Sequence, residues 1–206
     1  MRGRGHSQGT RKQVLSAAMR KFSEKSFLGA TTAEIAVEAG VSEKTIFDLF
    51  GDKKTLYLAV RESIHRNMLR DMLPRLPMGG GAPTVLRAFG REFLREVSTY
   101  SDRARVSIQS ITAIDDPDIK KSTQDFFLQL RELVKNILID GAKVGLVRDD
   151  LDLDQFAWTY TWALYSVGYV TLMDLPQQIP EEQALLFLNR LVDYIEPVKG
   201  AQTPVS

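Results

Sequence analysis

The segment at residues 31–53 reads TTAEIAVEAGVSEKTIFDLFGDK, and its pattern predicts two short helices joined by a tight turn. Thr31 and Glu34 form a T-x-x-E capping box, which satisfies free amide groups at a helix start. Gly40 supplies the left-handed residue that ends this helix, and Ser42 is suited to cap a second one. Apolar residues recur at helical spacing on one side of both segments: Ile35, Ala36, Ala39, Ile46, Leu49 and Phe50. Two short helices around a glycine-containing turn are typical of a helix-turn-helix, which holds its second helix rigidly enough to enter a DNA major groove.

This segment resembles the DNA-binding head of the tetracycline-repressor-like (TetR) family. The resemblance continues backward through residues 11–18 and Phe22, which are similar to the family's first helix. It continues forward to Lys53 and Leu56, where the family begins its fourth helix. The resemblance implies about nine helices, of which three form the head and the rest a larger bundle.

One departure from the family pattern lies in the second helix of the motif. The family usually has a tyrosine and then a tyrosine/histidine pair before the phenylalanine that corresponds to Phe50. This chain has Phe47, Asp48 and Leu49 at those positions. A phenol that would hydrogen-bond a phosphate is therefore missing. Asp48 would repel phosphate unless it accepts from a cytosine amino group, so the family's operator preference is not carried over.

Composition excludes several classes of protein. A chain of 206 residues can bury a sizeable core, and without cysteine it has no disulfide framework and no thiol catalysis. The start, MRGRGHSQGT, lacks the apolar run of a signal peptide, and no stretch reaches the ~18 apolar residues of a membrane span. We therefore expect a soluble cytoplasmic protein with no membrane partner.

The net charge of +1 hides an asymmetry along the chain. Residues 1–70 carry 13 Lys/Arg against 7 Asp/Glu, whereas residues 71–206 carry 14 against 19. The basic start of the chain contains Arg2, Arg4, Arg11 and Lys12. This start is either a solvated, disordered tail or an arm that attracts phosphate, and its position beside a helix-turn-helix makes the two about equal.

The rest of the chain reads as helices without alternating β-branched segments, so we expect an all-α fold. The expected helices after the motif run over 53–71, 84–99, 103–114, 117–140, 152–174 and 180–195. We predict a DNA-binding helix-turn-helix domain with a basic arm at residues 1–52. A ligand-binding and dimerisation domain follows at residues 53–197, and a disordered tail at residues 198–206.

An aromatic stripe lies on the helix expected at residues 152–174. Trp158, Trp162, Tyr165 and Tyr169 have 4-3-4 spacing and therefore share one face, which Met173 extends. Leaving such area in water is too unfavourable for a stable domain, so we expect the stripe to be covered. The cover is an ordinary core, a partner subunit or a small-molecule pocket, and the indole and phenol groups favour the last two.

The family resemblance implies that the last two helices pair across a dimer and that the preceding helices enclose an effector site. We therefore expect a homodimer through its last two helices and a small hydrophobic or aromatic effector. The candidate ligand-binding residues are Phe89, Phe93, Gln109, Phe126, Trp158, Trp162 and Tyr165.

Catalytic and metal-binding motifs do not stand out. His6 and His65 lack a cysteine or carboxylate at ligand spacing, so we expect no metal and no cofactor. For His65 we expect a satisfied or solvent-facing side chain, with hydrogen bonding in a pocket as the alternative. The acidic cluster Asp149, Asp150, Asp152 and Asp154 lacks the closing glutamate of an EF-hand loop, and helix capping explains it better.

The leading hypothesis is a homodimeric, ligand-responsive DNA-binding regulator, a repressor that binds a near-palindromic operator, and not an enzyme. Lys44 and Thr45 are expected to meet base edges or phosphates, and Phe47 to touch a thymine methyl. Thr32 and Lys53 match family positions that grip the DNA backbone. The full set of expected DNA-binding residues is Thr32, Ser42, Lys44, Thr45, Phe47 and Lys53.

Two rival functions remain open. The chain is a small-molecule binding protein or enzyme with a degenerate helix-turn-helix head, for which Asp48 and the missing tyrosine are the best support. Alternatively, it is a helical adaptor in which every aromatic belongs to a core or an interface. Salt-dependent binding to DNA separates the regulator from both, and the charge asymmetry favours the regulator.

Overall fold

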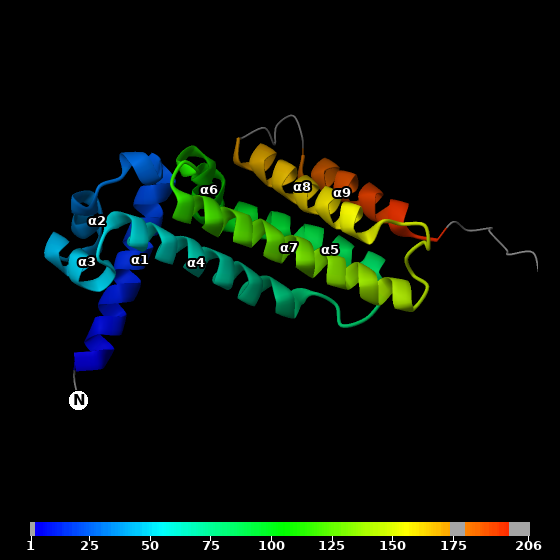
Figure 1. Cartoon of the computed structure of the whole chain (residues 1–206), viewed down its shortest axis with the longest axis horizontal. Helices are drawn as coiled ribbons and strands as arrows, with labels where there is room; N and C mark the ends of the chain where they lie inside the picture. The colour runs from blue at the N-terminus through cyan, green and yellow to red at the C-terminus, as the bar shows by residue number, and fades with distance from the viewer. Residues whose placement is uncertain (1–2, 174–179, 198–206) are drawn as a thin grey trace, which may run out of the picture. The chain divides into compact units, whose positions relative to one another are not determined.

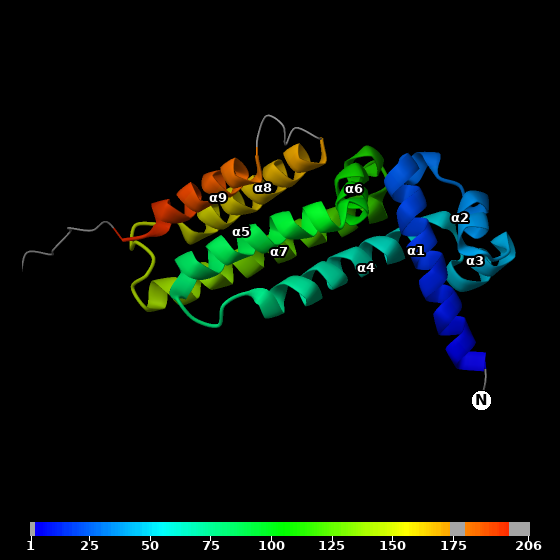
Figure 2. The same ribbon diagram turned by 180° about the vertical axis from the view of Figure 1, so that it is seen from behind.

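The computed structural model describes residues 3–173 and 180–197. Within these ranges the chain forms nine α-helices and two short 3₁₀-helices, with no strand (Figures 1 and 2). The prediction of an all-α protein is confirmed. The helices are α1 (Gly3–Gly29), α2 (Thr32–Ala39), α3 (Glu43–Phe50), α4 (Lys53–Met72), η1 (Leu73–Arg75), α5 (Gly81–Thr99), α6 (Ser101–Gln109), η2 (Ser110–Ala113), α7 (Pro117–Lys143), α8 (Leu153–Leu172) and α9 (Glu181–Ile195). The tail at residues 198–206, for which we expected disorder, lies outside the described residues.

Aspartate side chains cap the N-termini of several of these helices at the positions predicted from the sequence. The Thr55 N–H donates to Asp52 Oδ1 over 2.6 Å at the start of α4, and the Gln155 N–H donates to Asp152 Oδ1 over 3.0 Å at the start of α8. Asp116 caps α7 in the same way. Each bond satisfies an amide that has no partner inside its helix. The capping role expected for Asp152 in the acidic cluster is therefore confirmed.

Helix α1 differs from its expected form at both ends. The backbone is helical from Gly3, so residues 3–12 do not form an irregular tail. Near the other end, Ser26 has φ 61° and ψ 177°, a left-handed conformation that is uncommon for any residue but glycine. This break turns the chain before α2 and lets Phe27 pack against Tyr57, with ring centroids 4.9 Å apart.

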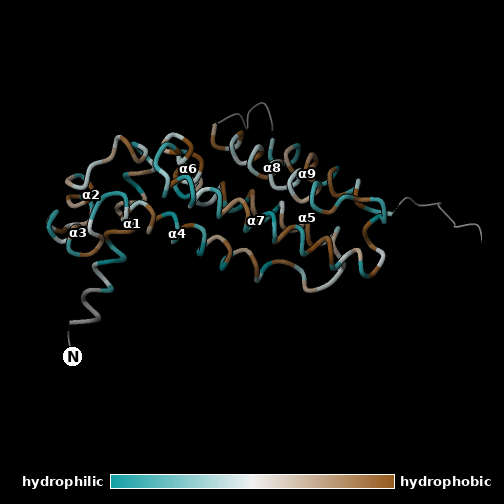
Figure 3. Tube along the Cα trace, viewed as in Figure 1, coloured by the Kyte–Doolittle hydropathy of each residue, from teal (hydrophilic) through white to brown (hydrophobic). Residues whose placement is uncertain are grey.

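The chain divides by its internal contacts into two compact units. The first unit comprises residues 1–70 and 100–126, and the second comprises residues 71–99 and 127–206. These units are defined by packing alone, so the functional division into residues 1–52 and 53–197 stays a prediction. Figure 3 shows hydrophobic and hydrophilic stretches alternating along each helix, as expected for helices with one buried side.

The first unit is built around α1. Its core joins one side of α1 to the buried sides of α2, α3 and α4, and the Phe22 ring meets the Tyr57 ring edge-on with centroids 4.9 Å apart. Such edge-to-face pairs are favourable beyond the area that they bury. The core residues include Val14, Ala17, Ala18, Phe22, Ile35, Ala36, Ile46, Phe50, Leu56, Tyr57, Val60, Ile64 and Val106.

The second unit packs α5 against α8 and α9. Tyr160 of α8 is fully buried, and its hydroxyl donates a 2.6 Å hydrogen bond to the carbonyl oxygen of Leu86 on α5. Burial also raises the pKa of this phenol, which stays neutral. The Tyr160 hydroxyl therefore has a hydrogen-bond partner inside the core, because the Leu86 backbone carbonyl lies close to it.

The aromatic stripe of α8 is covered only in part within the described chain, because Trp158 and Tyr165 are partly buried and the other members are exposed. Trp162 is 60% exposed, and Tyr169 and Met173 are about half exposed, whereas Phe156 and Tyr160 on the other side are buried. An ordinary core is therefore the wrong cover for Trp162, Tyr169 and Met173. Among the described residues, no helix is long and apolar enough to span a membrane.

Gly141→Ala should lower the free energy of unfolding by about 1–3 kcal/mol through overpacking. A Cβ at Gly141 would lie 2.4 Å from the Ala82 Cβ and 2.9 Å from the Val147 Cγ2. Urea unfolding followed by circular dichroism measures the change. The control is Gly9→Ala in α1, where a Cβ meets nothing within 4 Å and alanine's helix propensity should preserve or raise stability. Equal effects of the two substitutions would contradict the packing argument.

Candidate nucleic-acid interface

Helices α2 and α3 are joined by the tight turn that the sequence indicates. The Glu34 N–H donates to Thr31 Oγ1 over 3.2 Å, and the Thr31 N–H donates to Glu34 Oε2 over 3.1 Å, which completes the capping box. Gly40 has φ 66°, and the Val41 N–H closes the turn on the Ala36 carbonyl oxygen over 3.0 Å. The prediction of a helix-turn-helix is therefore confirmed at the level of individual hydrogen bonds.

Helix α3 has one buried side and one exposed side. Ile46 is fully buried and Phe50 is 6% exposed, because both belong to the core that is built on α1. On the other side, the Lys44 side chain is 82% exposed and Phe47 is 46% exposed. The core thus fixes the helix from behind, and a cation and an aromatic ring are left in solvent.

A single ion pair lies on the exposed side of α3. Lys44 Nζ is 3.0 Å from Asp48 Oδ2, one helical turn further on, and both side chains are largely exposed. Exposed pairs of this spacing contribute only about 0.3–0.5 kcal/mol. Lys44 is therefore free to exchange this carboxylate for another anion at little energetic cost.

Several residues expected to bind DNA also hold the first unit together. Ser42 caps α3 by accepting from the Thr45 N–H over 3.1 Å, and its Oγ lies 2.8 Å from Thr45 Oγ1. Thr32 Oγ1 donates to a Glu43 side-chain oxygen. Lys53 Nζ donates to the Ala30 carbonyl oxygen over 3.0 Å and lies 4.8 Å from the centroid of the Phe27 ring. Their proposed contacts with DNA stay predictions.

The acidic residues of α2 are paired with cations of α1. Lys25 Nζ lies 2.5 Å from Glu34 Oε1, and Arg20 Nε lies 2.8 Å from Glu38 Oε1. The hydrogen bond from Lys25 and then the amide of Thr31 lower the pKa of Glu34 to about 2. The hydrogen bond from Arg20 lowers the pKa of Glu38. These carboxylates stay ionised but compensated, so they repel an approaching phosphate less than free carboxylates would.

The expected ligand-binding residues fall in both units. Gln109 and Phe126 belong to the first unit, and the other five belong to the second. Phe89 is fully buried in the core, and Tyr165 stacks on Phe127 with ring centroids 4.1 Å apart. Phe93 lies 6.1 Å from Tyr165, and Trp158 lies 5.7 Å from the exposed Trp162. Their assignment to a ligand site stays a prediction.

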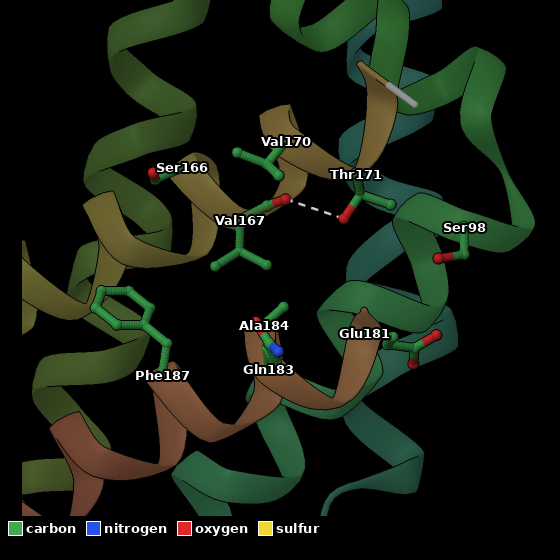
Figure 4. A pocket seen from close by; sticks show the side chains of 9 residues that line it. All are labelled: Ser98, Ser166, Val167, Val170, Thr171, Glu181, Gln183, Ala184 and Phe187. Atoms are coloured by element: carbon green, nitrogen blue, oxygen red, sulfur yellow. Dashed lines mark hydrogen bonds between the residues drawn. The ribbon is translucent and has the colours of Figure 1, made fainter. Parts of the chain in front are cut away.

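A pocket of about 260 Å³ opens in the second unit among α5, α8 and α9 (Figure 4). Ser98 and Thr171 lie toward one end of the pocket and the Phe187 ring toward the other, with Val167 and Val170 between them. The lining residues are Ser98, Ser166, Val167, Val170, Thr171, Glu181, Gln183, Ala184 and Phe187. None of the ligand-binding candidates lines it. Sequence reasoning missed it because we selected large aromatic residues, and this wall consists mostly of small residues.

Two polar residues of α4, Arg61 and His65, have buried polar atoms that the sequence analysis did not predict. Arg61 is 1% exposed, although the sequence analysis did not select it. The Nε2 atom of His65 is buried, and no described residue hydrogen-bonds it, so the expectation of a satisfied or solvent-facing histidine is wrong. A signal was present in the sequence: Tyr57, Arg61, Ile64 and Met68 have 4-3-4 spacing, which places Arg61 in the apolar stripe of α4.

Known proteins resemble this chain in sequence and in fold. The family profile described as "Bacterial regulatory proteins, tetR family" matches residues 14–60, which contain the helix-turn-helix. Over 153 residues the chain is 27% identical to the uncharacterized HTH-type transcriptional regulator YdeS of Bacillus subtilis, with 74% of this chain and 75% of that protein covered. Over 148 residues it is 28% identical to the HTH-type transcriptional repressor AcnR of Corynebacterium efficiens, with 70% and 72% covered.

Similarity to solved structures extends over most of the chain. A putative transcriptional regulator from Saccharomonospora viridis, solved in complex with choline, matches with a TM-score of 0.75 and 19% sequence identity. The match covers 91% of this chain and 95% of that one. At this identity the likeness concerns the fold, in which a helix-turn-helix is combined with a larger helical part.

The stability of the first unit should fall between about pH 4.5 and pH 2 through Glu34. Its pKa in the folded chain lies below the ordinary value of 4.5, so the carboxylate stabilises the fold above pH 4.5 and loses this effect toward pH 2. Glu34→Gln keeps an acceptor for the capping box but carries no charge. The variant should melt below the wild type at pH 7 and together with it at pH 2.

Thermal melts followed by circular dichroism between pH 7 and pH 2 measure this convergence. Glu62→Gln in α4, which removes an exposed carboxylate paired with Arg66, is the control for a general charge effect. Melting curves of Glu34→Gln and wild type that stay parallel down to pH 2 would show that the carboxylate has no such role.

Proposed function

The chain belongs to the tetR family of bacterial regulatory proteins, and on this premise we propose that it is a homodimeric repressor. In this proposal it binds a near-palindromic DNA operator and releases it when a small hydrophobic or aromatic molecule binds. One observation carries the proposal: α3 is fixed by its buried side and leaves Lys44 and Phe47 exposed. A rigid helix with an exposed cation suits insertion into a major groove.

The proposed DNA contacts follow from the exposure of each side chain on the motif. Lys44 reaches a guanine edge or a phosphate, and Phe47 contacts a thymine methyl. Ser42 and Thr45, at the first turn of α3, complete the groove contacts. Thr32 and Lys53 lie at the starts of α2 and α4, where the positive end of a helix favours a phosphate.

The proposed dimer rests on the uncovered aromatic side of α8 and on α9. Large apolar side chains remain about half exposed there: Trp162, Tyr169, Met173, Leu186, Phe187 and Tyr194. Exposed large apolar side chains on two helices that pack against each other are a candidate interaction site. A second copy of the chain would cover it with the same residues in a two-fold symmetric contact.

The proposed response to a ligand is supported by a solved structure of similar fold, and the proposed repressor role by a relative in sequence. The Saccharomonospora viridis regulator was solved with choline, and AcnR is named a repressor. In this chain a ligand would act by binding the conformation whose heads are misaligned for the operator more tightly than the aligned one. A cytoplasmic location and the absence of catalysis are part of the same proposal.

Lys44→Ala should weaken operator binding about 5- to 150-fold, which corresponds to the roughly 1–3 kcal/mol expected for a lysine contact to a base edge. The operator is first selected from a random DNA pool, and the affinity is measured by fluorescence anisotropy of a labelled duplex. The matched control is Lys121→Ala in α7, because Lys121 Nζ lies 2.9 Å from Asp125 in a pair of the same spacing. If both variants bind like the wild type, α3 is not the helix that contacts the bases in the major groove.

Asp48→Asn should strengthen binding several-fold to every duplex, because it removes a negative charge beside Lys44 on the exposed side of α3. The same anisotropy assay is repeated between 50 and 200 mM salt, with Asp125→Asn as the matched control. A loss of affinity confined to one G·C position would mean instead that Asp48 accepts from a cytosine amino group.

A further inference from the structure

Arg61 is the most buried charged side chain among the described residues. It lies in the middle of α4, within the stripe formed by Tyr57, Ile64 and Met68, and it is 1% exposed. An arginine keeps its charge under all conditions relevant to proteins, because its delocalised guanidinium is not deprotonated there. The first unit therefore holds a permanent positive charge inside its core.

The contacts of Arg61 leave this charge uncompensated. Its Nε donates to Ser122 Oγ on α7 over 3.2 Å. The neutral Tyr57 phenol also interacts with the guanidinium, and the Tyr57 ring centroid lies 6.0 Å from its Cζ, at the outer limit of a cation–π contact. Its Nη1 is buried without a hydrogen-bond partner. Within the part of the chain that the structure describes, no carboxylate forms an ion pair with it.

Other partly buried arginines of this chain form ion pairs with carboxylates. Arg87 meets Asp193 and Glu196, with the second pair at 2.8 Å, and Arg148 meets Asp150. Arg131 meets Asp154 and Glu132. All three side chains are more exposed than Arg61, yet each has a carboxylate. A buried unpaired charge is strongly unfavourable, so its presence at Arg61 calls for an anion that the chain itself does not supply.

His65 lies one turn further along α4 and extends the same site. Its imidazole stacks on the Phe126 ring of α7, with centroids 3.7 Å apart and an interplanar angle of 11°. Burial and then the charge of Arg61 lower the pKa of His65 to about 3, so the ring is neutral. Its Nε2 is buried without a described partner, and a neutral imidazole can still donate or accept one hydrogen bond.

We propose that Arg61 binds the carboxylate of the effector, between α4 and the first turns of α7. The planar guanidinium can donate two parallel hydrogen bonds to a carboxylate. Ser122 orients the guanidinium by accepting from its Nε, and His65 supplies a further polar contact. The Tyr57 and Phe126 rings favour an apolar or aromatic body on the ligand. This inference rests on the proposed function, since it names the chemical class of the molecule that releases the operator.

The burial of Arg61 also indicates how such a ligand would act. Nη1 is enclosed by protein atoms, so an anion reaches it only when α4 shifts relative to α7. Only two residues separate the end of α3 from the start of α4, and the first residue of α4, Lys53, donates a hydrogen bond to the Ala30 carbonyl oxygen of the first unit. A carboxylate that stabilises the shifted α4 therefore stabilises a different placement of α3.

The test uses the full chain without DNA and two matched series of probes. Formate, acetate and benzoate carry a carboxylate, and formamide, acetamide and benzamide are neutral analogues of similar size. Each is titrated at constant ionic strength while the melting temperature and the imidazole signals of His65 are recorded. The chain has only two histidines, so His6→Gln assigns the spectrum. The carboxylates should raise the melting temperature saturably and shift the His65 signal, and the amides should do neither.

Three substitutions locate the effect. Arg61→Met removes the charge and should abolish the carboxylate response, while its melting temperature without probe stays at or above that of the wild type. Arg61→Lys keeps the charge but not the fork, so a weakened response should remain. Arg66→Met, on an exposed position of the same helix, should respond like the wild type.

Two outcomes would overturn the proposal. One is a carboxylate response that persists in Arg61→Met, and the other is a wild type that responds to none of the carboxylates, including formate, which needs the least space. Both leave DNA binding untouched, because no DNA is present. Conversely, a chain that binds no operator but shows the Arg61-dependent response would refute the repressor and keep the anion site.

Discussion

One-sided burial of two short helices is the constraint on which the structure of the motif depends. Helices of eight residues such as α2 and α3 are not stable alone in water, because nucleation is costly and few hydrogen bonds repay it. They persist because Ile35, Ala36, Ile46 and Phe50 pack on α1 and because caps satisfy their free amides. The side of α3 that points away from this core is left exposed with a fixed orientation. Recognition of DNA requires such a surface, and here it follows from packing behind the helix.

In the first unit, charged side chains are paired at the surface but one is unpaired in the interior. At its surface, the carboxylates Glu34 and Glu38 are paired with cations of α1, so the negative charge of α2 is compensated. In its interior, Arg61 has only neutral partners, Ser122 and Tyr57, and no carboxylate. Surface pairing contributes modestly to stability, whereas an unpaired interior charge opposes it. Helix α4 therefore carries an energetic cost that a bound anion would remove, and it starts directly after the helix that we propose to read DNA.

Most helix boundaries could be predicted because they depend on contacts within a few residues. Asp52, Asp116 and Asp152 cap their helices as the sequence indicates, and Gly40 ends α2 in the left-handed conformation. The positive φ of Ser26 could not be predicted, because a serine has no intrinsic preference for this conformation. The early start of α1 was also missed, since a basic sequence beside a DNA-binding motif resembles a tail as closely as a helix.

The sequence by itself determined the all-α class, the capped helix-turn-helix and the helical stripes, because each is set by periodicity and local hydrogen bonding. Only the tertiary structure decided which side of a stripe is covered. Tyr160 finds a backbone carbonyl inside the core, while Trp162 on the same helix remains in solvent. The tertiary structure also decided that Arg61 is enclosed without a carboxylate and that His65 stacks on Phe126. Burial and pairing join residues that are far apart in the chain, and no local pattern of residues encodes the position of a distant neighbour.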